Sequence, residues 1–159
     1  MKTHTKLGAG VAAFGAAAAV VLASAGGAGA AHEGLVVQGD LDGRAEVATD
    51  ATDNGIVGDP NGRGEAYFFS TSGTNICYVI EVDKIAPATM AHIHKGDAGT
   101  NGPVVATLSP PTGGTSAGCV DGLAAGLAAD ITKFNPSDYY VNVHNAEYPG
   151  GAVRAQLGS

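Results

Sequence analysis

Beyond about residue 35, the chain is built from short runs in which apolar and polar residues alternate. Clusters of Gly, Asn, Asp and Pro separate these runs. Strand side chains point alternately to opposite faces, so short runs at this spacing are typical of an all-β sandwich or barrel. We therefore predict a single antiparallel β-sandwich or barrel-like domain. Its expected strands cover residues 35–41, 45–49, 64–70, 76–85, 89–94, 104–108, 139–144 and 152–157.

One segment has a helical rather than a strand period. Leu123, Leu127, Ile131 and Phe134 recur at intervals of three or four residues, which predicts one short helix over residues 123–134. Pro136 follows closely, and the residue before a proline avoids helical backbone angles. We expect the helix to end there.

The N-terminal segment predicts an exported protein. Lys2 and Lys6 make the start positive, residues 7–31 carry no charge, and small residues close the run at 28–30. This order is typical of a secretory signal peptide, which we place at 1–31. An uncleaved membrane anchor is the alternative, since the neutral run is long enough to span a bilayer. The run consists mostly of Ala and Gly, which insert poorly.

Cleavage before Ala31 or before His32 leaves a mature domain that we place at 32–159. An N-terminal His32 would offer both an amine and an imidazole to a metal. We expect the mature protein to be secreted, extracellular or held in the cell envelope, without stable membrane insertion.

The charge balance limits the partners. The chain carries 8 basic and 15 acidic residues, a net charge of −7. Nucleic-acid binding needs clustered Lys and Arg, so no nucleic-acid partner is expected. The length suits one domain and excludes a multidomain enzyme.

Cys77 and Cys119 are the two cysteines of the chain. Outside the cytosol, two cysteines in a small domain usually pair, so a disulfide is predicted. Two separate buried thiols are the alternative. The chain has no C-x-x-C motif, which argues against a redox-active pair.

Three predicted strands carry their polar side chains on one face. In residues 90–94, Met90, His92 and His94 share a face, while Ala91 and Ile93 take the other. Residues 139–144 and 152–157 alternate in the same way. If these strands share a sheet, one polar face collects His92, His94, His144, Tyr140, Asn142, Arg154 and Gln156.

The histidines on this face allow three interpretations. A His-x-His pair plus a third histidine can bind copper or zinc through neutral imidazoles. The same residues could form a hydrogen-bonded polar layer that holds neighbouring loops, or serve as acid and base. A possible binding face is also predicted on the polar side of these strands, made of Tyr140, Asn142, Arg154 and Gln156. No catalytic residues are assigned.

The loop at residues 50–64 contains several oxygen-bearing side chains that calcium could use. They miss the spacing of an EF-hand, so a turn-rich loop is the favoured interpretation. These side chains are Asp50, Asp53, Asn54, Asp59 and Asn61.

Two blocks of sequence resemble the CHRD (chordin-type) domain. One is the His-Ile-His block at residues 91–105, and the other is the Val-His…Pro-Gly-Gly…Arg block at residues 139–157. Residues 58–64 and Cys77-Tyr78 are also similar to secreted bacterial members. Ala155 departs from the usual glycine. The resemblance implies a β-rich extracellular domain and no particular reaction.

The resemblance leads to two functional hypotheses. The first is a non-catalytic binding or structural module for an unknown extracellular protein, cell-wall polymer or matrix component. The second is a copper- or zinc-binding protein using His92, His94 and His144, with His32 as a possible fourth ligand. The His-x-His strand also resembles the copper–zinc superoxide dismutase sandwich, but more loosely. That two-metal site needs more histidines than this chain has, so dismutase activity is not expected.

Overall fold

The computed structural model describes residues 36–49 and 55–158. The chain divides between His32 and Glu33, and everything described here belongs to the second unit. The predicted signal peptide, its cleavage site and His32 lie outside the described residues. None of the helices among the described residues is long and apolar enough to cross a bilayer.

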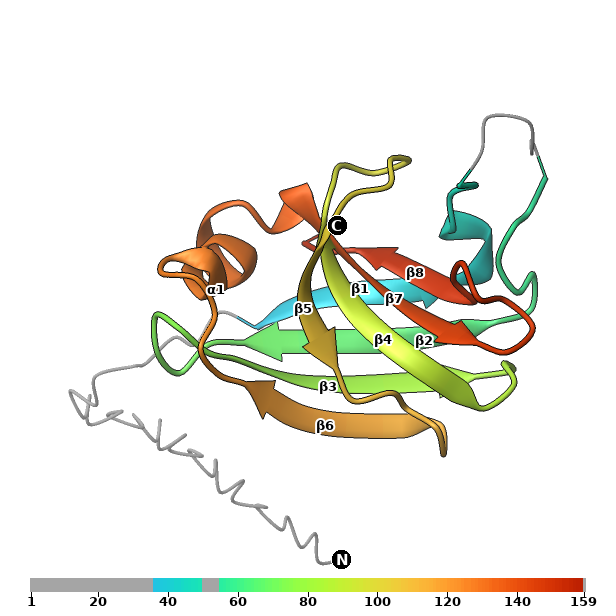
Figure 1. The fold of residues 1–159 in the computed structure, drawn as a ribbon, viewed down its shortest axis with the longest axis horizontal. Coiled ribbons are helices and arrows are strands. Elements are labelled where there is room, and N and C mark those ends of the chain that lie inside the picture. Colours follow the sequence, from blue (N-terminus) through green and yellow to red (C-terminus); the bar gives the residue numbers. More distant parts are fainter. Residues whose placement is uncertain (1–35, 50–54, 159) are drawn as a thin grey trace, which may run out of the picture. The chain divides into compact units, whose positions relative to one another are not determined.

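Eight strands form one antiparallel sheet in the order β5-β4-β7-β8-β1-β2-β3-β6 (Figure 1). The strands are β1 (Val37–Asp42), β2 (Arg63–Phe69), β3 (Ile76–Asp83), β4 (Ala88–Lys95), β5 (Val104–Leu108), β6 (Thr115–Val120), β7 (Tyr139–Asn145) and β8 (Val153–Gln156).

The sheet curls into a nearly closed barrel, as the alternating pattern predicts. Strands β4, β5 and β7 lie across β1, β2 and β3 (Figure 1). The two ends of the strand order approach one another, where Ser116 on β6 donates a hydrogen bond to the carbonyl of Ser109, just after β5, at 2.8 Å. The apolar face fills the interior, with Ile93, Val143 and Val153 fully buried in the core. The all-β prediction is therefore confirmed.

One predicted strand is absent, and one strand of the structure was not predicted. Residues 45–49 are not a strand: Gly43–Ala45 forms a 3₁₀ turn, η1, and irregular backbone follows it. Asp42 caps this turn by accepting a hydrogen bond from the Arg44 amide at 2.8 Å. A side chain on Gly43 would overlap the carbonyl oxygen of Asp59, so this turn depends on glycine. The strand that was missed is β6.

The predicted helix is present but shorter. It comprises α1 (Leu127–Ala129) and a π-helical turn, η2 (Asp130–Phe134). Gly126, just before it, has a left-handed φ of 85°, which delays the start of the helix. The amide of Asn135 closes the last turn on the carbonyl of Asp130 at 2.9 Å. A 3₁₀ turn, η3 (Pro136–Asp138), then leads into β7.

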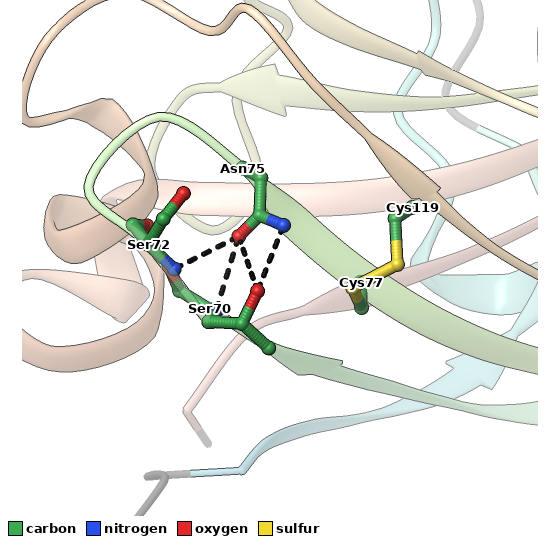
Figure 2. The surroundings of a disulfide bond; sticks show 6 residues. Ser70, Ser72, Asn75, Cys77 and Cys119 are labelled. Atoms are coloured by element: carbon green, nitrogen blue, oxygen red, sulfur yellow. Dashed lines mark hydrogen bonds between the residues drawn. A yellow bond between two sulfur atoms is a disulfide. The ribbon is translucent and has the colours of Figure 1, made fainter.

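The disulfide between Cys77 and Cys119 is present, as predicted. The two residues lie opposite each other on β3 and β6 and join the last strand of the order to its neighbour (Figure 2). The adjoining loop is organised by Asn75, whose side-chain oxygen accepts hydrogen bonds from the amides of Thr71 and Ser72, both at 3.0 Å.

Candidate metal centre

His92, His94 and His144 meet on the polar face of two paired strands. His92 and His94 lie on β4, and His144 lies on the neighbouring β7. One ring nitrogen from each histidine lies within 4.8 Å of the others. The strand parity read from the sequence predicts this convergence only if both strands share a sheet, and they do. Sheet pairing thus brings together His94 and His144, which are fifty residues apart in the sequence.

Backbone carbonyls fix two of the three imidazoles. Nδ1 of His94 donates to the carbonyl of Gly102 at 2.8 Å, and Nδ1 of His144 donates to that of Pro149 at 3.0 Å. Each ring is therefore left with a lone pair on Nε2. Nε2 of His94 is buried and has no hydrogen-bond partner. Protein histidines that hold metals almost always donate their other N–H in this way.

The imidazole of His92 faces that of His144 directly. Nδ1 of His92 lies 3.1 Å from Nε2 of His144. Because His144 already donates through Nδ1, we assign the proton of this contact to His92. The Oδ1 atom of Asn142 also lies 3.1 Å from Nε2 of His144. Because this tautomer of His144 leaves no proton on Nε2, the Asn142 amide would have to turn over for its nitrogen to donate there. A metal ion could take the place of the proton between the two rings.

The environment favours neutral rings. Burial lowers the pKa of His92, and the nearby His144 and His94 lower it further. Burial also lowers the pKa of His144, although its hydrogen bond to Pro149 acts in the opposite direction. Neutral imidazole is the form that binds metals, so these shifts keep the ligands available at neutral pH.

A stack of flat side chains supports His94 from behind. The ring of Tyr140 lies parallel to that of His94, with centroids 4.7 Å apart and planes at 7°. The guanidinium carbon of Arg154 lies 3.4 Å from the centroid of Tyr140 on β7. The orientation of His94 is thus set by a stack as well as by its hydrogen bond to Gly102.

The same residues hold the loop after β4. Arg154 donates to the carbonyls of Thr100 at 2.7 Å and Asp97 at 3.3 Å. Gln156 donates to the carbonyl of Gly96 at 3.0 Å. The Gly102 carbonyl that orients His94 belongs to this loop, so the loop forms one wall of the site.

This arrangement bears on the predicted binding face. Tyr140, Asn142 and Arg154 are buried, and Gln156 is partly buried. They therefore act mainly between strands and loop. Recognition of an outside partner by these four residues stays a prediction.

Replacing Tyr140 by Phe tests the link between the stack and the loop. The Tyr140 hydroxyl accepts a hydrogen bond from the Gly102 amide at 3.2 Å. Tyr140→Phe keeps the stacked ring but leaves that amide without its partner, so we expect a loss of about 1–2 kcal/mol in the free energy of unfolding. Urea denaturation measures it. An unchanged midpoint would show that the hydroxyl does not hold the loop.

Sequence reasoning missed the carbonyl groups of Gly102 and Pro149. Every residue has a carbonyl, so no sequence signal marks the two that orient these rings. The prediction of a turn-rich loop at residues 50–64 agrees with the structure at one position. The Asp59 side chain accepts a hydrogen bond from the Asn61 amide at 3.0 Å, which is turn chemistry. Asp50, Asp53 and Asn54 lie outside the described residues.

Comparison with known proteins places the chain in a family. No curated protein and no solved structure matches it. The CHRD domain does match, over residues 37–157, from the first strand to just past the last. That match includes all three converging histidines, the stack on His94 and both cysteines. The chain therefore belongs to the CHRD domain family.

Proposed function

We propose that this protein is an extracellular module that binds a copper or zinc ion through His92, His94 and His144. The observation that carries the proposal is the paired arrangement at His94 and His144, in which Nδ1 of each ring donates to a backbone carbonyl and leaves a lone pair on Nε2. A polar layer that only held loops together would have no need to leave a buried nitrogen of His94 without a partner.

The geometry requires only a small adjustment to accept an ion. Copper or zinc bound to imidazole at 2.0–2.1 Å would hold the nitrogens about 3.3–3.6 Å apart. The nitrogens now lie within 4.8 Å of one another, and His92 and His144 are already at 3.1 Å. Small rotations of the rings on their strands would bring the third nitrogen in.

The extracellular part of the proposal rests on the family and on the cross-link. CHRD domains are extracellular modules, and the Cys77–Cys119 disulfide fits an oxidising compartment. A protein, cell-wall or matrix partner would act in addition to the metal site, on the exposed surface of the module.

Calorimetric titration of residues 32–159 with copper(II) and with zinc tests the proposal. We expect stoichiometric binding of at least one ion by the wild type and its loss in the His92→Ala/His94→Ala variant. Thr107→Ala is the matched control, because Thr107 lies opposite His92 on β5 and offers no ring nitrogen. Circular dichroism checks that each variant is folded.

The pH dependence gives a second reading of the same experiment. Protons compete with the ion for the imidazole lone pairs, so affinity falls as the rings become protonated. The pKa values of His92 and His144 are lowered, so binding should persist at pH 6.5 and weaken below it. If the wild type binds neither ion better than the double variant, the cluster has a structural role only.

A further inference from the structure

Met90 lies beside the three histidines on the same face of the sheet. It is paired with His144 across β4 and β7, and residues 90 to 94 of β4 keep one unbroken register with β7. Directly opposed residues of an antiparallel pair point to the same face, with Cβ atoms about 4.5–5.5 Å apart. Met90, His92 and His94 also alternate with the buried Ala91 and Ile93. Both relations place Met90 at the edge of the cluster.

The strand is irregular just before this residue. The register between β4 and β7 shifts between Ala88 and Met90, as at a bulge. Bulges re-aim side chains and are common next to functional sites. Met90 is 44% exposed, although a thioether side chain of this size is usually buried. Its side chain is therefore not needed for the core.

The charge of the site limits which ion suits it. Among residues 36–49 and 55–158, the cluster that could hold an ion consists of three histidines and contains no carboxylate. The positive guanidinium of Arg154 stacks on Tyr140, which stacks on His94. This fixed positive charge repels a divalent ion about twice as strongly as a monovalent one, and the neutral ligands do not offset it. The Glu46 carboxyl near Arg154 opposes the charge only once it ionises, at a pKa raised to about 7.

We propose that Met90 is a fourth ligand of the site and makes it selective for copper(I). This inference rests on the proposed function and extends it. Soft thioether sulfur favours copper(I), and imidazole accommodates it. All four ligands, three imidazoles and one thioether, are neutral. With a monovalent ion, the half-buried site therefore has to accommodate only a single positive charge. Zinc gains little from sulfur of this kind and would bind through the histidines alone.

Competition for copper(I) against bicinchoninate, under anaerobic conditions with ascorbate, measures the contribution of Met90. Met90→Leu keeps the volume and the apolar character of the side chain but removes the sulfur. We expect this variant to lose copper(I) affinity by about tenfold to a hundredfold, the range seen when groups that support a metal are removed. Its zinc affinity should stay within about threefold of the wild type.

A direct spectroscopic test follows from the composition. Met90 is the only methionine in residues 32–159. Protein labelled with ¹³C at the methionine methyl group therefore gives one Met90 resonance. Copper(I) should shift this resonance at one equivalent, and zinc should leave it near its original position. The His92→Ala/His94→Ala variant, which has the same methionine, should show no shift.

The outcomes separate this inference from the metal site itself. If the wild type binds neither copper nor zinc, the three-histidine site fails and Met90 fails with it. If the wild type binds copper(I), but Met90→Leu binds it equally well and the methyl resonance does not move, the site stands and the role of Met90 is overturned. Tighter binding of zinc than of copper(I) would also overturn the selectivity.

Discussion

Removing the disulfide with Cys77→Ser/Cys119→Ser is expected to lower the free energy of unfolding by about 4 kcal/mol. The cross-link spans 42 residues, and in the chain-entropy model a loop of that size costs the unfolded chain about this much conformational freedom. A typical domain has a total stability of about 5–15 kcal/mol, so the variant would be close to unfolding. Urea denaturation of the oxidised wild type and the double variant measures the difference.

The loss should appear first at one edge of the sheet. Strand β6 ends the strand order, and it pairs in the ladder with β3 only. Hydrogen exchange should therefore show faster exchange of the β6 amides than of those in β7, which lies between two partners. Alkylation of the oxidised wild type without reductant provides the control, because no thiol should react. A difference below about 1 kcal/mol would contradict the chain-entropy account.

The strands that carry the site are those that could be predicted best. In β4, β7 and β8 large apolar residues alternate with polar ones, because one face of each strand fills the core. Parity alone therefore placed His92 and His94 on the polar face of one strand and His144 on the polar face of another. Whether the strands adjoin depends on sheet order, which alternation within a strand does not specify.

Strand β6 shows where that reasoning ends. Its sequence, Thr115-Ser-Ala-Gly-Cys-Val120, has no alternation of large apolar residues, because neither of its faces is deeply buried. It is held by its pairing with β3 and by Cys119. The opposite error occurred at residues 45–49, where an alternating run turned out to be a turn followed by irregular backbone. Tertiary contacts such as the close approach of Gly43 and Asp59 override local preference there.

The support of the site could not have been predicted. The stack of Arg154 on Tyr140 and of Tyr140 on His94 joins three residues from three strands. Parity placed them on one face but gave no contact among them. The Gly102 carbonyl depends on how the loop after β4 folds back, and loop conformation carries no periodic signal.

Glu46→Gln is expected to stabilise the protein above neutral pH and to leave it almost unchanged in acid. Glu46 lies in the irregular segment after η1, where it helps to line a cavity of about 160 Å³ together with Val57, Gly150 and Gly151. Its Oε1 atom is buried without a hydrogen-bond partner, packed where a side chain on Gly151 would clash with it. Burying the charged carboxylate is therefore costly.

Burial raises the pKa of Glu46 from 4.5 to about 7, although the nearby Arg154 partly offsets the rise. The folded state then binds more protons than the unfolded state between these two values, so wild-type stability falls as pH rises from about 4.5 through about 7. Above that window the ionised carboxylate costs at most about 3 kcal/mol. The neutral amide of glutamine has almost the same shape and avoids this cost.

Urea denaturation of wild type and variant from pH 4.5 to pH 8 measures the difference in free energy of unfolding at each pH. The difference should be near zero at the acid end and should grow to at most about 3 kcal/mol in favour of the variant at pH 8. The lowered pKa values of His92 and His144 give the opposite slope, but they are present in both proteins and cancel. Carbon-13 NMR of the Glu46 carboxyl group should show a midpoint near 7. A difference that does not change with pH, together with a carboxyl group that titrates like that of an exposed glutamate, would mean that solvent reaches Glu46 and that its burial costs nothing.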